Sequence, residues 1–218
     1  MNLPKTDNRR RFISGVGAIL IGASFLLGPL GISVTGVSAS SQTMIALAGF
    51  KTLLNMVFMI AAVFGITQLL RKRADWIGLL GAASTLIGWT VAARIGVMLQ
   101  LRAVSQSGVE AIPGNLTEVL RESAPAVLAS IFPVGLFFPL GLVTLGLALA
   151  WARPIRWWIG LLLALGGVLF PIGRAWGYFW AVVACDIILG SALILIGWQI
   201  LARPELWRQS SFEENSTV

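Results

Sequence analysis

The segment from residue 157 to 202 contains only two charged residues, Arg174 and Asp186. As a single helix these 46 residues would be about 69 Å long, more than twice the roughly 30 Å thickness of a bilayer's hydrocarbon core. An apolar stretch of this length must therefore turn back on itself. The turn is predicted at residues 175–179, where aromatic residues typical of a membrane interface are concentrated.

The rest of the chain repeats this apolar character. Hydrophobic residues make up 57% of the sequence and charged residues only 11%, far below the roughly one quarter usual in soluble domains. The fold class predicted is all-α, a polytopic integral membrane protein with a six-transmembrane-helix bundle in one domain over residues 12–202. The predicted spans cover residues 12–34, 48–70, 76–99, 127–151, 157–175 and 180–202, with an outer loop at 100–124.

The distribution of Lys and Arg predicts the orientation. Eleven of them lie in the basic N-terminus (residues 1–11), the two loops on the same side and the tail (residues 203–218), against two in the opposite loops. By the positive-inside rule both termini are expected in the cytoplasm, in the cell membrane. The net charge of +7 then reflects topology, so no nucleic-acid partner is expected.

Two absences restrict the chemistry. The chain has no histidine and a single cysteine, Cys185, so neither a His-containing metal site nor an intrachain disulfide can form. We expect Cys185 to be a buried apolar residue, and we expect no metal. No nucleophile stands beside a base and no acidic pair lies within a span, so no catalytic residue is predicted and enzyme activity is disfavoured. No cofactor is expected, although a bound lipid is compatible with the sequence.

Small residues spaced four apart mark two helices for close packing. They are expected to make contacts inside the bundle, with a dimer interface as the alternative. The stripes are Ser84, Gly88, Ala92 and Gly96 in the third span and Ser14, Ala18 and Gly22 in the first.

Four charged residues lie inside the predicted spans at similar depth. Lys51, Arg94, Arg174 and Asp186 are all roughly 24–28 Å from the cytoplasmic helix ends, at 1.5 Å per residue. Lys51 is close enough to a helix end to reach the headgroups. Asp186 is too short to do so and is expected to pair with Arg174, or with Arg94. The pair either fixes the register of the last two helices or belongs to a net positive site for a ligand.

Prolines and aromatic residues near this depth are candidates for lining such a site. Proline interrupts a helix because it lacks a backbone donor, and aromatic side chains suit an amphipathic ligand. The predicted function is non-enzymatic binding or transport of a small anionic or amphipathic molecule, or a lipid headgroup, with membrane lipids as partners. The alternative is an accessory subunit held by another membrane protein. The lining candidates are Trp89, Pro133, Pro139, Pro171, Trp176, Tyr178 and Trp180.

Overall fold

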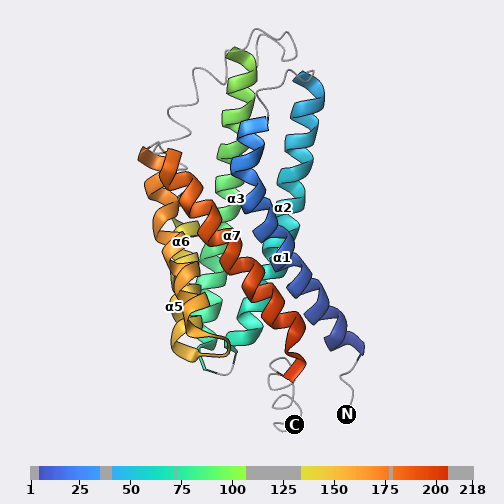
Figure 1. Cartoon of the computed structure of the whole chain (residues 1–218), viewed down its shortest axis with the longest axis vertical. Coiled ribbons are helices and arrows are strands. Elements are labelled where there is room, and N and C mark those ends of the chain that lie inside the picture. The colour runs from blue at the N-terminus through green and yellow to red at the C-terminus, as the bar shows by residue number, and fades with distance from the viewer. Residues whose placement is uncertain (1–4, 35–40, 72, 107–133, 177–178, 206–218) are drawn as a thin grey trace.

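The computed structural model describes the backbone of residues 5–34, 41–71, 73–106, 134–176 and 179–205, and within it the side chains of residues 7–27, 53–71, 73–91, 134–173 and 180–205. In these ranges the regular structure is entirely helical. The helices are α1 (Lys5–Val34), α2 (Ser41–Leu70), α3 (Asp75–Gln106), α5 (Phe137–Ala152), α6 (Trp157–Trp176) and α7 (Phe179–Ala202), shown in Figure 1.

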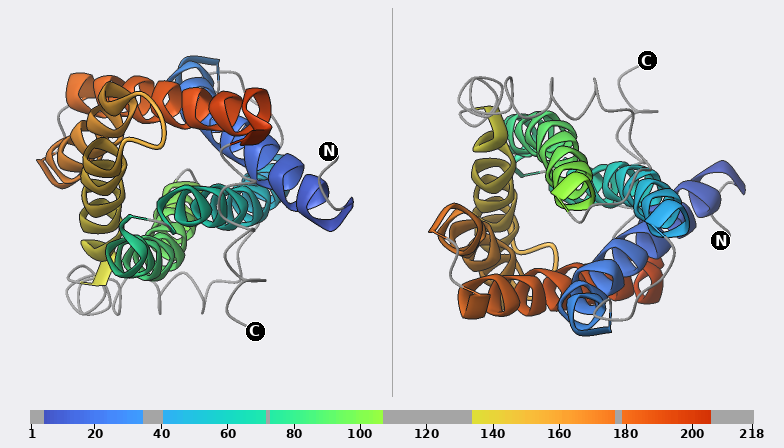
Figure 2. Two further views of the ribbon diagram at one scale, coloured as in Figure 1. Left: turned by 90° about the horizontal axis from the view of Figure 1, so that it is seen from below. Right: turned by 90° about the horizontal axis from the view of Figure 1, so that it is seen from above.

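The helices form a closed ring. Each of α1, α2, α3, α5 and α6 packs against the next of these helices along the chain, and α7 packs against both α6 and α1. Figure 2, which views the bundle along its length, shows α7 returning beside α1. The start of α1 and the end of α7 are at the same end of the bundle in Figure 1. The inner faces of the helices thus surround a common interior.

The ring closes at an antiparallel seam between α1 and α7. A Cβ atom on Gly22 would lie 2.6 Å from the carbonyl oxygen of Gly190, and one on Gly197 would lie 2.5 Å from that of Gly15. Real Cβ atoms do not approach other atoms so closely. The two backbones are therefore in direct contact, the arrangement that small residues permit between apolar helices.

Glycine also brings α5 against both of its neighbours. A Cβ atom on Gly88 of α3 would overlap the backbone nitrogen of Phe138. One on Gly146 would lie 2.6 Å from the carbonyl oxygen of Gly160 in α6. Beside the first contact, the Ser84 hydroxyl donates a hydrogen bond to the Phe137 carbonyl over 2.8 Å. Helix α5 is thereby held on two sides by backbone contact.

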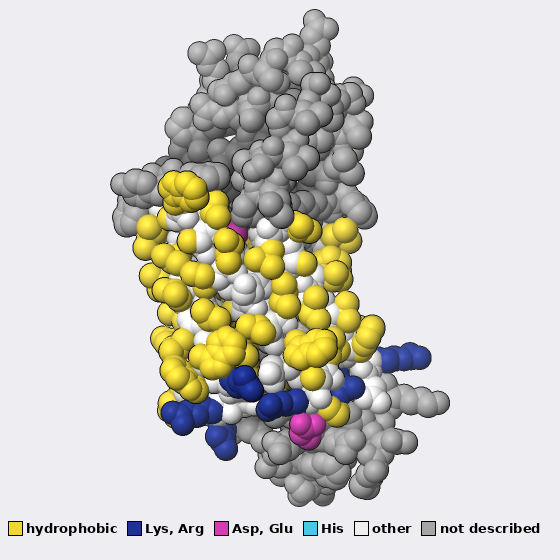
Figure 3. Space-filling model, in the orientation of Figure 1, with side chains coloured by type: hydrophobic (Ala, Val, Ile, Leu, Met, Phe, Trp, Pro, Cys, Tyr) yellow, Lys and Arg dark blue, Asp and Glu magenta, His cyan; other side chains and the backbone are white. Residues whose placement is uncertain are grey.

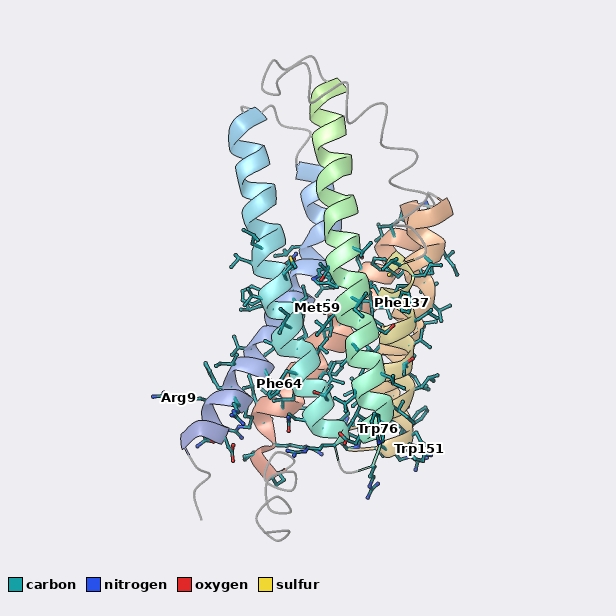
Figure 4. All side chains as sticks on the ribbon, turned by 180° about the vertical axis from the view of Figure 1, so that it is seen from behind. Arg9, Met59, Phe64, Trp76, Phe137 and Trp151 are labelled. Atoms are coloured by element: carbon teal, nitrogen blue, oxygen red, sulfur yellow. The ribbon has the colours of Figure 1, made fainter. Side chains whose placement is uncertain are left out.

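The described outer surface has an apolar belt and one basic end. Large hydrophobic side chains such as Leu53, Val57 and Leu80 are more than half exposed around the bundle. Dark blue Lys and Arg side chains gather beneath this belt in Figure 3, at the end where Figure 4 labels Arg9. We call this region the basic end; its exposed members are Arg9, Arg10, Arg71, Arg73, Arg153, Arg156 and Arg203.

Among the described residues, three helical segments are long and apolar enough to cross a membrane. They are Asp7–Leu27, Leu53–Leu70 and Trp180–Ala202. Two shorter helical segments, Phe137–Ala152 and Trp157–Gly173, are also apolar. This composition and the exposed apolar belt indicate that the protein associates with a membrane.

Several helix boundaries differ from the predicted spans. Helices α1 and α2 begin seven residues earlier than predicted, because a helix can include the polar residues that flank its apolar run. For the same reason α3 continues to Gln106, so residues 100–106 are helical rather than part of the predicted outer loop.

The predicted start of the fourth span, residues 127–133, lies outside the described residues. In its described part, residues 134 and 135 are helical, the helix is interrupted at Leu136, and α5 begins at Phe137. Pro139 explains the break, because it has no N–H to donate to the carbonyl of Gly135. Pro139 therefore lies in the first turn of α5, directly after the interruption, whereas Pro171 lies within the continuous helix α6.

Candidate functional site

Four aromatic side chains form a continuous chain of contacts across the interior of the ring. The rings of Phe25 and Trp89 are 5.9 Å apart between centroids, and those of Trp89 and Phe138 are 4.9 Å apart. Phe138 then meets Phe170 edge-on at 4.8 Å and 71°. These residues come from α1, α3, α5 and α6 in turn, so the aromatic chain links four of the helices. Edge-on and tilted contacts of this kind are favoured by the ring quadrupoles.

Trp89 contributes a polar atom to this apolar setting. Its indole Nε1 is buried and has no hydrogen-bond acceptor among the described residues. Other atoms in the same situation are Nε and Nη1 of Arg11 and Oε1 of Gln199, toward the basic end. The Trp89 ring itself is half-buried against the core. A buried donor without an acceptor costs about 1–3 kcal/mol, so an acceptor brought by a ligand would be stabilised here.

Asp186 lies at the same height as the aromatic chain. Gly166 of α6 packs on Leu189 of α7, and Gly173 packs on the backbone of Val182. Along α6, Phe170 lies midway between these two glycines. Along α7, Asp186 lies midway between Val182 and Leu189. Since α6 and α7 run antiparallel, the carboxyl group and the Phe170 ring occupy one level of the bundle.

The carboxyl group of Asp186 is directed into the bundle. Its side chain is only 5% exposed. On α7, Gly190 and Gly197 face α1 while Val182 and Leu189 face α6. At 3.6 residues per turn, Asp186 falls between these two stripes, about 100–120° around the helix from the exposed Trp180, Ile187 and Trp198. We call Phe25, Trp89, Phe138, Phe170 and Asp186 the inner layer.

The predicted cationic partners can be placed only by their backbone. The side chains of Lys51, Arg94 and Arg174 lie outside the described ones. Arg174 directly follows Gly173, whose neighbour across the seam, Val182, is four residues before Asp186. Because the helices run antiparallel, the backbones of Arg174 and Asp186 are thus offset by five residues, roughly 7.5 Å along the bundle. This spacing is compatible with the predicted ion pair.

Cys185 is fully buried, as predicted. It is 0% exposed, and its Sγ lies 3.4 Å from the Gly166 carbonyl oxygen. The thiol therefore belongs to the packing between α6 and α7. No group of three or more metal-ligating side chains occurs in the described part of the chain.

The predicted lining residues lie in different parts of the structure. Trp89 is part of the inner layer, Pro139 is buried, and Pro171 is half-buried. Trp180, at 79% exposure, lies on the outer surface and does not line the interior. Pro133 and the side chains of Trp176 and Tyr178 lie outside the described residues.

The inner layer contains three residues that the sequence did not single out, Phe25, Phe138 and Phe170. Each is an aromatic residue in an apolar helix, a pattern shared by many lipid-facing positions. One signal was available: Phe138 and Phe170 each directly precede a proline, at positions where the helix was expected to bend. Their mutual contact could not be read from spacing alone.

The small-residue stripes pack inside the bundle wherever they are described. Gly22 contacts α7, Ser14 lies against Gly65 of α2, and Gly88 contacts α5. Ala18 is 0% exposed, and Ser84 bonds to α5. The side chain of Ala92 and the surroundings of Gly96 lie outside the described side chains. The described members of the stripes therefore make contacts inside the bundle.

Among the residues that the structure describes, the inner layer and the basic end both bring polar groups together. Comparison with known proteins finds no matching protein family, no curated relative and no matching solved structure.

Proposed function

We propose that the protein is a membrane protein of six spans, with both termini in the cytoplasm, that binds a small amphipathic anion within its inner layer. The topology is supported by the basic end, which collects the N-terminus of α1, the C-terminus of α7 and two turns between helices. Positive charge of this kind is retained on the cytoplasmic side of membranes. The inner layer then lies toward the outer surface.

The unpartnered Nε1 of Trp89 carries the proposal for binding. A buried indole N–H is a donor only, so what it lacks is an acceptor oxygen. Around it, the faces and edges of Phe25 and Phe138 provide apolar contact. A ligand that joins an oxygen-rich head to an apolar body matches both features.

The charge balance favours a negative head group. Asp186 is the single carboxylate among the four charged residues predicted at this depth, against Lys51, Arg94 and Arg174. If Arg174 neutralises Asp186, two cations remain. In a medium of low dielectric constant a surplus positive charge attracts an anion strongly.

Ligand-dependent stabilisation of the purified protein tests this proposal. We expect decyl phosphate to raise the Tm of the protein in neutral lipid nanodiscs, and inorganic phosphate and decanol to raise it much less. Trp89→Phe keeps the aromatic ring but removes the donor, and should reduce the shift. Trp198→Phe, on the exposed face of α7, is the matched control. Equal shifts in both variants, or no shift with decyl phosphate, would refute binding in the inner layer.

The topology has a separate test. Cys185 is the single cysteine of the sequence, so Cys185→Ala provides a cysteine-free background into which single cysteines can be placed. Cysteines at Arg9 and Arg156 should react with a membrane-impermeant maleimide only after the cells are opened. Labelling of either position in intact cells would contradict the proposed orientation.

A further inference from the structure

Two short turns at the basic end lie side by side. The turn between α2 and α3 is closed by hydrogen bonds from the backbone N–H groups of Arg73 and Ala74 to the Leu70 carbonyl, at 3.0 and 2.9 Å. Arg73 then reaches across to the next turn, where its Nη1 donates to the carbonyl of Ala152, at the C-terminus of α5, over 3.0 Å. This bond fixes the two turns relative to each other.

The turn between α5 and α6 has a defined shape. Arg153 adopts the left-handed conformation, with φ 52° and ψ 40°, and its N–H caps the helix at the Leu149 carbonyl. Two residues later, Ile155 is 4% exposed and anchors the turn in the core. Arg156 follows, and its carbonyl accepts a bond from Ile159. Arg153 and Arg156 therefore flank a buried anchor and present their exposed side chains from a fixed backbone.

Exposed tryptophans border these arginines. Trp76 at the start of α3 is 78% exposed, Trp151 at the end of α5 is 68% exposed, and Trp157 at the start of α6 is 53% exposed. Figure 4 shows Trp76 and Trp151 at the same end of the bundle as Arg9, on the side across from α1. Tryptophan is favoured at the level of the lipid headgroups, so its presence places these turns at that level in a membrane.

The paired turns carry a strong surplus of positive charge. Arg71, Arg73, Arg153 and Arg156 are exposed, and the acidic residue in the same turns is Asp75. Asp75 lies in the first turn of α3, where a carboxylate stabilises the helix N-terminus. One guanidinium nitrogen of the exposed Arg73 side chain donates to Ala152, and a guanidinium group carries further N–H donors.

We propose that the paired turns bind the phosphate of an anionic phospholipid at the membrane surface. Guanidinium groups bind phosphate oxygens by paired hydrogen bonds, and the neighbouring indole rings lie where the lipid's glycerol and upper acyl chains would be. Arginines that serve only to orient the protein need to lie on one side of the membrane. Here they are held in a fixed geometry beside aromatic side chains, as expected for a binding site.

The test compares two double variants with equal loss of charge at the same end. Arg153→Gln with Arg156→Gln removes the proposed site, and Arg9→Gln with Arg10→Gln is the control on α1. Binding of phosphatidylglycerol is measured by native mass spectrometry and by the Tm in phosphatidylcholine nanodiscs with and without phosphatidylglycerol. We expect about fivefold weaker binding for each arginine lost from the turns, and little change in the control.

A third variant tests geometry. Arg153→Lys with Arg156→Lys keeps the charge but loses the planar fork, and should bind phosphatidylglycerol less tightly than the wild type but more tightly than the glutamine variant. Equal losses in the turn and control variants would show that only net charge matters and would overturn the proposal. The absence of any preference for phosphatidylglycerol over phosphatidylcholine in the wild type would do the same. Neither outcome bears on ligand binding in the inner layer.

Discussion

The basic end and the inner layer carry charge in opposite ways. At the basic end many arginines are exposed, and each side chain can be solvated. In the inner layer the described charge is a single carboxylate, 5% exposed and surrounded by apolar helices. The contribution of an exposed charge to protein stability depends little on its exact position, whereas a buried charge is tolerated only where its partners are arranged around it. The comparison predicts that substitutions of similar size will have very different effects in the two regions.

The largest effect is expected at the centre of the inner layer. Phe138 is 0% exposed and contacts both Trp89 and Phe170, so Phe138→Ala should leave a cavity and lower the free energy of unfolding by about 3–5 kcal/mol. The measurement is reversible unfolding of the purified protein in mixed micelles. Its neighbour Phe137 is 46% exposed and gives a matched control, because Phe137→Ala should cost less than about 1 kcal/mol. Similar losses from both substitutions would mean that the aromatic contacts do not hold the bundle together.

The predicted ion pair should give the next largest effect. Arg174→Leu would leave the Asp186 carboxylate without its predicted partner and should cost about 3 kcal/mol. Replacing both residues, Arg174→Leu with Asp186→Leu, should recover most of that loss, since two leucines can pack where two charges were paired. The same unfolding measurement gives the coupling energy. A double variant no more stable than Arg174→Leu alone would exclude this pairing.

A smaller effect of opposite sign is expected at Trp89. Trp89→Phe removes a buried donor that has no described acceptor, so in the absence of ligand the stability should be unchanged or raised by about 1 kcal/mol. The stabilisation by decyl phosphate should be lost at the same time. If Trp89→Phe lowers the free energy of unfolding by more than the smaller ring accounts for, the indole N–H is already hydrogen-bonded within the protein.

The smallest effect is expected at the basic end. Arg9 and Arg10 are exposed, so Arg9→Gln with Arg10→Gln should change the free energy of unfolding by less than about 0.5 kcal/mol. The same variant, measured for orientation by cysteine labelling, should still insert with both termini in the cytoplasm because the other basic turns remain. Marked destabilisation of this double variant would show that substitutions at the basic end and in the inner layer do not differ in their effect on stability.

The sequence predicts the helices better than it predicts their contacts. Helices α6 and α7 lie within one residue of the segments expected at 157–175 and 180–202, because runs of apolar residues determine length. The burial of Cys185 was also anticipated. The predicted start of the fourth span at residue 127 lies outside the described residues; within them, Pro139 leaves the carbonyl four residues before it without a donor, and the regular helix α5 begins at Phe137.

What could not be predicted is which face of an apolar helix turns inward. Trp180 is exposed and Asp186 is buried on different faces of α7, but every face of that helix is rich in hydrophobic residues. A lipid-facing side chain and a core side chain therefore have the same character, and the pattern that separates them in soluble helices is absent. The contacts among Phe25, Trp89, Phe138 and Phe170 depend on how four helices meet, and local sequence does not record this.

The seam between α1 and α7 has a consequence for how the protein is made. The first helix of the ring packs on the last, so Gly22 has no partner until Gly190 has been synthesised. At ~5–20 residues per second, translation between these two glycines takes roughly ten to thirty seconds, far longer than a helix needs to form. During that interval α1 must wait in the membrane with its glycine face toward lipid or toward a chaperone. Ring closure is therefore a late step of biosynthesis, and a chain whose translation stops before α7 leaves the glycine face of α1 uncovered, although α1 can already pack on α2.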